Sequence, residues 1–200
     1  MIPAAEALER LREGNRRFAT DASTSASTGF RTRRLETAPN QEPFAVILGC
    51  ADSRVAPELL FDQGIGDLFI VRVAGNVVGG GGALVKGSIE YGVAELGAPL
   101  VMVLGHTECG AVKAAIKHLD DKDPLPGAIG ELVNRIRPAV IKAQSMPGDR
   151  LDNAIRANVA LGVGTLRGLQ PILAPAVKRG QVKVVGALYD LRTGGVTLTE

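Results

Sequence analysis

Two apolar segments of strand length each end in a glycine that is followed at once by a soft metal ligand. The first, residues 44–48, leads through its glycine to Cys50, and the second, residues 100–104, leads to His106 and then Cys109. Continuous apolar strands are typical of a parallel sheet covered on both faces. Neighbouring parallel strands end at one edge of an open α/β sheet, so we expect the three ligands to meet there.

Strand-like and helix-like segments alternate along the rest of the chain. Residues 67–73 and 182–189 read as further strands, the former with continuous apolar character, as if both of its faces were covered. Apolar residues at helical spacing predict a helix that begins near Ala4 and further helices near 57–61, 84–96, 109–118, 129–144 and 151–169. This order predicts an α/β fold, in which a central, mostly parallel β-sheet is flanked by helices, with an N-terminal helical arm and residues 196–198 as a candidate antiparallel edge strand.

Composition excludes several classes of function. Hydrophobic residues make up 46% of the chain and charged residues 22%, as in a soluble folded protein. The net charge is +2 with acids and bases interspersed, so we expect no nucleic-acid and no membrane partner. The first residues lack the pattern of a secretory signal, which makes the cytoplasm the expected location. In that reducing compartment the two cysteines are better read as metal ligands or inert thiols than as a disulfide.

Cys50, His106 and Cys109 together have the chemistry of a catalytic zinc site. His106 and Cys109 lie three residues apart, so one turn of the chain can present both, while Cys50 arrives from the other strand. A set of two cysteines and one histidine leaves one zinc position open for water. The alternative is that both cysteines are buried small hydrophobes, since free cysteine is among the most buried residue types.

Asp52 and Arg54 add a charged pair beside Cys50. Because the two lie two residues apart, they can point to one side, and Arg54 can hold the carboxylate through a two-point contact. A carboxylate held in this way can orient a metal-bound water. The alternatives are a closed structural zinc site with Asp52 as the fourth ligand, or an ordinary salt bridge.

These residues resemble the motifs of the β-class carbonic anhydrases with a plant-like type I site. The two specific motifs are Cys50-Ala51-Asp52-Ser53-Arg54 and His106-Thr107-Glu108-Cys109-Gly110. Segments along most of the chain follow the family's pattern in the same order: 14–18, 66–69, 72–76, 87–91 and 186–190. The resemblance implies zinc-dependent, reversible hydration of carbon dioxide to bicarbonate and a proton, with one Zn²⁺ per chain.

The resemblance also implies roles for single residues. Cys50, His106 and Cys109 correspond to the zinc ligands, and Asp52 and Arg54 correspond to the dyad that gates the fourth position and orients the zinc-bound water. The pocket residues implied by the family pattern are Gln41, Phe69, Tyr91 and Gly110. Since the family often draws the apolar wall from a partner subunit, it also implies a homo-oligomer, either a dimer or a dimer of dimers.

Two further positions and the domain organisation complete the expectations. Some bacterial relatives carry a tryptophan three residues before the first cysteine, linked to an inhibitory bicarbonate site; Ile47 stands there in this chain, which argues against that regulation. His118 is a conceivable proton shuttle, although a solvated helix residue is the simpler interpretation. We expect residues 1–200 to form a single domain, with an N-terminal helix and arm at 1–43 and the zinc-binding α/β core at 44–200.

Other functions are open to the same residues. The same site chemistry could hydrolyse carbonyl sulfide or carbon disulfide, and a non-catalytic, zinc-stabilised assembly protein would need the ligands alone. The glycine run at 79–82 suggests a nucleotide loop, but neither a G-x-G-x-x-G motif nor the lysine of a phosphate loop is present, so a turn is the better interpretation.

Overall fold

The fold is built on a five-stranded sheet. The computed structural model describes residues 2–24, 29–79, 83–123 and 125–199. The sheet has the order β2-β1-β3-β4-β5. Its strands are β1 (Ala45–Gly49), β2 (Leu68–Arg72), β3 (Leu100–His106), β4 (Lys183–Tyr189) and β5 (Val196–Thr199). The first four strands pair in parallel, and β5 pairs antiparallel with β4, which confirms the predicted α/β fold and its antiparallel edge.

Alternation of side chains along the central strands divides the core into two layers. Ile47 and Met102 face one side of the sheet, together with residues of the first helix, whereas Val46 and Val103 face the other. Both faces of β1 and β3 are therefore buried, as their continuous apolar sequences predict.

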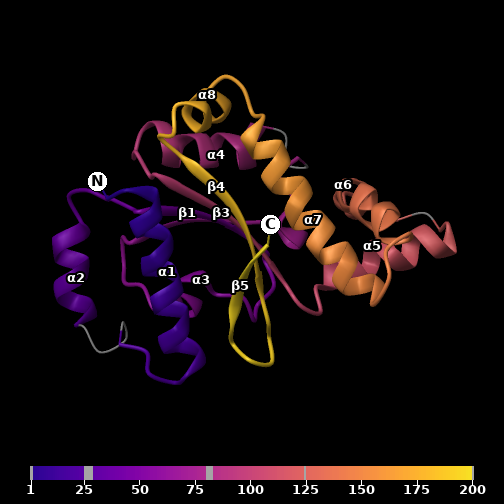
Figure 1. The fold of residues 1–200 in the computed structure, drawn as a ribbon, viewed down its shortest axis with the longest axis horizontal. Coiled ribbons are helices and arrows are strands. Elements are labelled where there is room, and N and C mark those ends of the chain that lie inside the picture. Colours follow the sequence, from indigo (N-terminus) through magenta and orange to yellow (C-terminus); the bar gives the residue numbers. More distant parts are fainter. Residues whose placement is uncertain (1, 25–28, 80–82, 124, 200) are drawn as a thin grey trace.

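Helices cover both faces, and two more close the carboxyl end of the sheet (Figure 1). In chain order they are α1 (Ala4–Ala19), α2 (Phe30–Thr37), α3 (Pro57–Leu60), α4 (Ala83–Ala94), α5 (Gly110–Asp121), α6 (Ile129–Ala143), α7 (Arg150–Arg167) and α8 (Leu173–Lys178), with the 3-10 turn η2 at Ala74–Asn76. α5 and α6 enclose a third apolar cluster, and this cluster contains both cysteines. None of the described helices is long and apolar enough to cross a membrane.

The structure corrects three details of the prediction, and a fourth lies largely outside the described residues. The strand at 67–73 is β2, the sheet edge, and four of its five residues are only half-buried, so its faces are not both covered within one chain. The helices α2 and α8 were not predicted, because α2 is polar with no buried residue and α8 has only six residues. β3 continues to His106, and α5 begins after Cys109. The glycine run lies largely outside the described residues, since 80–82 are not among them.

The N-terminal helix is joined to the core at Asn15. The Asn15 side-chain amide donates to the backbone oxygens of Leu60 and Gly194, at 3.1 and 2.9 Å, and its oxygen accepts from the Val196 amide at 2.7 Å. One buried side chain thus links α1 to the end of α3 and to β5. The organisation as a single domain remains a prediction, which these links support.

Replacement of Asn15 by alanine should destabilise the whole fold. The change leaves three backbone groups without a partner, and we expect a loss of about 1–3 kcal/mol in the free energy of unfolding. Urea denaturation measures it. Arg12→Ala on the same helix is the control, because the Arg12 side chain is 63% exposed, and it should shift stability by less than about 0.5 kcal/mol. Equal stability of the two variants would contradict the proposed link.

Candidate metal centre

The three predicted ligands meet at the carboxyl edge of the sheet. Cys50 follows β1 directly, His106 is the last residue of β3, and Cys109 is the N-cap of α5. Their ligand atoms all lie within 4.8 Å of one another, and all three residues are buried, at 4%, 0% and 0% exposure. The parallel pairing of β1 with β3 creates this convergence, since Gly49 is in register with Leu104. The geometry fits a metal ion such as zinc, which takes thiolate and imidazole ligands.

The orientation of His106 supports a metal at this cluster. Its Nδ1 lies 2.9 Å from the Thr107 carbonyl oxygen, which favours the tautomer protonated at Nδ1. That tautomer leaves a lone pair on Nε2, and Nε2 is buried with no hydrogen-bond partner among the described residues. A metal-bound histidine usually donates its other ring N–H to a carbonyl or carboxylate in this way. The orientation of His106 therefore fits that of a metal ligand.

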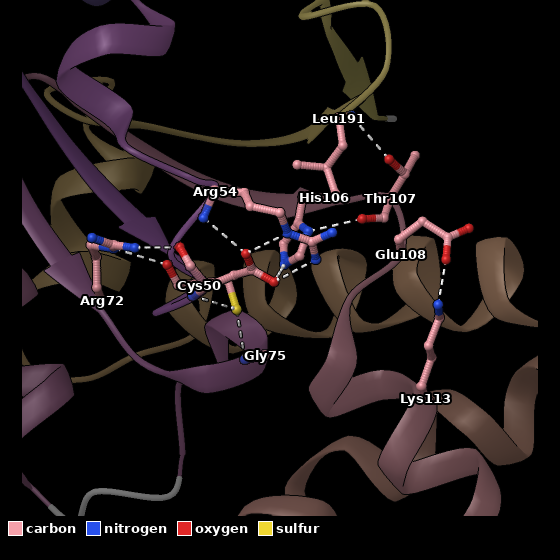
Figure 2. Close-up of polar contacts among 10 residues, drawn as sticks. Cys50, Arg54, Arg72, Gly75, His106, Thr107, Glu108, Lys113 and Leu191 are labelled. Atoms are coloured by element: carbon pink, nitrogen blue, oxygen red, sulfur yellow. Dashed lines mark hydrogen bonds and ion pairs between the residues drawn. The ribbon is translucent and has the colours of Figure 1, made fainter.

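Cys50 is held by two backbone amides (Figure 2). Its Sγ accepts from the amide of Gly75 at 3.2 Å and from that of Asp52 at 3.4 Å. Gly75 has φ +69°, and a Cβ there would lie 2.7 Å from Ile136 Cδ1, so only glycine fits the turn without strain. The buried Asn158 amide fixes the same turn by donating to the Gly75 oxygen at 2.7 Å.

The two thiols influence each other's ionisation. A hydrogen bond from Cys109 lowers the pKa of Cys50, and the same contact raises the pKa of Cys109, because a second negative charge would lie beside the first. Burial raises both pKa values, while the amides of Asp52 and Gly75 lower that of Cys50. A divalent cation compensates the second charge and favours loss of both protons.

Asp52 and Arg54 form a tight ion pair beside His106. Arg54 donates to Asp52 from its backbone amide at 3.0 Å, from Nε at 2.9 Å and from a terminal nitrogen at 2.8 Å. Asp52 Oδ2 is 3.9 Å from His106 Nε2, although Asp52 is not one of the three residues in the metal-binding cluster of the described chain. The Arg54 hydrogen bonds are the largest cause of a strongly lowered pKa of Asp52.

Arg72, at the end of β2, fastens the loop that carries Cys50 and Asp52. Its Nε donates to the Cys50 carbonyl at 2.9 Å and a terminal nitrogen donates to the Asp52 carbonyl at 2.6 Å (Figure 2). No role was predicted from the sequence for Arg72, Gly75, Thr107 or Asn158. Spacing cannot reveal them, because they act through backbone groups; the available signals were the motifs at 72–76 and 106–110, which contain the first three.

The predicted pocket residues divide into two groups. Gly110, the first residue of α5, lies beside Cys109 and has nothing within 4 Å of an added Cβ, so this side of the site is open. Gln41 is exposed before β1, where it lines a cavity with Phe44 and Asp67 at the amino end of the strands. The cluster lies at the carboxyl end, so one chain does not bring Gln41 to it.

Phe69 and Tyr91 form an aromatic pair on the β2 side of the sheet. Their ring centroids are 6.0 Å apart, and Tyr91 is 47% exposed. Phe69 is in register with Val46, and Val46 is four residues before Cys50, roughly 13 Å along an extended strand. The pair therefore lies on a partly exposed face, away from the metal-binding cluster of its own chain.

His118 does not adjoin the cluster. It lies two turns into α5, roughly 13 Å along the helix from Cys109. Its Nδ1 contacts the carboxylate of Asp123. His118 is thus a helix residue, as interpreted from the sequence, but its side chain is paired with Asp123 and only 19% exposed, so it is not fully solvated.

Comparison with known proteins agrees with this geometry. The family model described as carbonic anhydrase matches residues 45–196. A carbonic anhydrase of Mycolicibacterium smegmatis is 39% identical over 192 residues, which cover 96% of this chain and 91% of that protein. The Coccomyxa β-carbonic anhydrase, solved with acetazolamide, is 30% identical, with a TM-score of 0.73 and coverage of 96% of this chain and 85% of that one. The β-carbonic anhydrase CcaA is 27% identical, with a TM-score of 0.75 and coverage of 96% and 95%. The chain belongs to the β-carbonic anhydrase family.

Proposed function

We propose that this chain catalyses the zinc-dependent, reversible hydration of carbon dioxide to bicarbonate and a proton. The observation that carries the proposal is the buried cluster of Cys50, His106 and Cys109, in which the unpartnered His106 Nε2 is available as a ligand. Three protein ligands leave one position for water, as in catalytic zinc sites. Family membership supports the same reaction, because the relatives are carbonic anhydrases.

The bound ion and the protein contribute differently to the reaction. Zinc, when bound, supplies a Lewis acid that lowers the pKa of water to about 7 and so makes hydroxide available near neutral pH. Cys50, His106 and Cys109 hold the ion, and the amides of Gly75 and Asp52 support the charge on the Cys50 sulfur. The open space beside Gly110 gives a small apolar substrate access to the cluster.

Asp52 and Arg54 are proposed to orient the reacting water. Arg54 engages both carboxylate oxygens of Asp52, and this supports a role in holding the carboxylate as an acceptor instead of a fourth ligand. The Asp52 side chain is 14% exposed, so it is sheltered yet still borders the site. Because its pKa is lowered, the carboxylate is ionised throughout the neutral range and can accept a hydrogen bond from water at every working pH.

We further propose that the pocket is completed by a second subunit. The edge strand β2 has apolar side chains that are only half-buried, and an open apolar edge of this kind is normally covered. Two-fold pairing of such edges runs the strands of the two subunits in opposite directions. The amino end of one subunit, with Gln41, then lies beside the carboxyl end of the other, with its metal cluster.

Carbonyl sulfide and carbon disulfide remain alternative substrates for the same site. Rates on carbon dioxide and on both sulfur compounds, measured with one preparation, decide between them. A non-catalytic assembly role is disfavoured, because the relatives are enzymes.

The metal assignment predicts that loss of one thiol abolishes both zinc binding and activity. The purified protein should contain one zinc per chain and hydrate carbon dioxide rapidly in stopped-flow assays. Cys109→Ser should bind far less than one zinc per chain, because a neutral hydroxyl replaces a buried thiolate. Lys113→Gln is the control, since Lys113 is half exposed and pairs with Glu108 on the surface; it should retain zinc. Full zinc content in Cys109→Ser would refute the ligand set.

The dyad assignment predicts a loss of turnover without loss of metal. Asp52→Asn and Arg54→Gln should each lower kcat by about 100-fold or more, the typical contribution of a positioned proton acceptor. Asp120→Asn is a matched control, because Asp120 makes a similar two-point contact with Arg150 on the surface, at 2.7 and 2.9 Å. Near-normal turnover of zinc-loaded Asp52→Asn would contradict the proposal.

The ion pair of Asp52 with Arg54 determines how stability depends on pH. Because the pKa of Asp52 is lowered, the ion pair contributes fully to the free energy of unfolding above pH 3.8, the ordinary pKa of the carboxyl. This contribution is lost only as pH falls through the lower pKa of the folded state. Asp52 should therefore not titrate in the neutral limb of the wild-type pH–rate profile, and Asp120→Asn should show the same profile as the wild type.

A shared pocket predicts complementation between two variants that are each defective on their own. Gln41→Ala should lower activity although Gln41 lies far from the cluster of its own chain, and Cys50→Ser should be inactive. Refolded together in equal amounts, they should recover about a quarter of wild-type activity, because half of the dimers are mixed and each mixed dimer has one intact site. If Gln41 acted within its own chain, mixing would restore nothing. Light scattering checks that both variants remain oligomeric.

A further inference from the structure

A cavity lies apart from the metal cluster, between the turn after β2 and helices α4, α6 and α7. Its volume is about 300 Å³. None of the residues around it is a proposed zinc ligand or part of the Asp52–Arg54 pair. The lining residues are Asn76, Val77, Val78, Gly79, Lys86, Asn134, Arg135, Pro138, Asn158, Leu161, Gly162 and Thr165.

Asn76 gives this cavity an unused hydrogen-bond donor. The residue is 3% exposed, and its Nδ2 is buried without a partner in the described part of the chain. Buried amide donors are nearly always paired in folded proteins, with protein groups, water or a ligand. Asn76 also has φ +46°, a left-handed conformation that asparagine, aspartate and glycine tolerate best. The turn thus fixes the conformation of Asn76, which lines the cavity.

The charges around the cavity all have one sign. Lys86 from α4 and Arg135 from α6 are the charged residues of its lining, and neither is ion-paired with an acid within the described ranges. The Arg135 guanidinium approaches the turn closely, since one of its terminal nitrogens is 3.8 Å from the point where a Cβ added to Gly79 would lie. Lys86 is half-buried. Two unneutralised cations beside a fixed neutral donor are the elements of an anion site.

Three other cavities of the described chain are larger, and none of them has this combination. The cavity that Gln41 lines contains Glu42, Asp67 and Glu95. The cavity between α5 and α6 contains Asp123, which contacts His118. The cavity between α1 and α2 has four acidic residues in its lining: Glu13, Glu36, Asp62 and Asp67. At least one acid therefore lines each of these cavities, whereas none of the described acids lines the cavity at Asn76.

We propose that the cavity at Asn76 binds a doubly charged oxyanion of the phosphate class. Its two negative charges match Lys86 and Arg135, and its oxygens accept from Asn76 Nδ2, which the fold leaves without a partner. The volume exceeds that of a single phosphate group, so a phosphate with a small organic substituent also fits. Because Asn76 directly follows Gly75, whose amide donates to Cys50, the bound anion also restrains a turn that supports the metal cluster.

Calorimetric titration of the zinc-loaded protein with inorganic phosphate, at constant ionic strength in chloride, tests this site. The wild type should bind one phosphate per chain with saturable heat. Arg135→Gln should weaken binding at least tenfold through loss of a charged donor, and so should Asn76→Asp, which keeps the size of the side chain and tolerates the left-handed turn but places a carboxylate at the wall. Arg137→Gln is the matched control, because Arg137 lies on the same helix but lines the cavity between α5 and α6.

The controls distinguish a specific phosphate site from nonspecific attraction of anions to a basic surface. Zinc content and the circular dichroism spectrum of each variant confirm that it is folded. Absence of saturable phosphate binding to the wild type would overturn the proposal. Equal weakening by Arg135→Gln and Arg137→Gln, or unchanged affinity in folded Asn76→Asp, would overturn it as well. None of these outcomes depends on hydratase activity, so the anion site and the proposed function fail or stand separately.

Discussion

The site depends first on the parallel pairing of β1 with β3. This pairing brings the carboxyl ends of two segments that are more than fifty residues apart in the chain to the same edge of the sheet. Cys50 and His106 meet there because neither strand can slip by one residue without exchanging its two buried faces. The register is therefore fixed by the apolar core, and the position of the ligands follows from it.

Burial of three soft donors is unfavourable unless something compensates it, and the chain provides part of the compensation itself. The amide of Gly75 meets the Cys50 sulfur, and the Thr107 carbonyl meets Nδ1 of His106. His106 Nε2 still has no partner among the described residues, and two thiolates at this site would repel each other. A divalent cation removes both costs in one step, so metal binding is expected to contribute to folding as well as to chemistry.

The parts of the structure that follow from local sequence pattern could be predicted from the sequence alone. The central strands, α1, the long helices α6 and α7 and the three ligands have clear periodicity or chemistry. α2 has no buried face to create a pattern, and Arg72 acts on backbone carbonyls that carry no side-chain signature. The partial burial of β2 could not be predicted either, because an apolar strand has the same sequence pattern whether a helix or a second subunit covers it.

That ambiguity in β2 bears on how the family's pocket is built. Within one chain the metal ligands, Arg54 and the open side at Gly110 are gathered at the carboxyl edge, whereas Gln41 lies at the amino edge and Phe69 and Tyr91 lie on the partly exposed face. A single fold can complete the first group, since its members follow strand ends. In the proposed dimer, the second group reaches the metal cluster of the partner subunit across a two-fold axis at the β2 edge. Metal binding would then be a property of the chain, whereas substrate binding would be a property of the assembly.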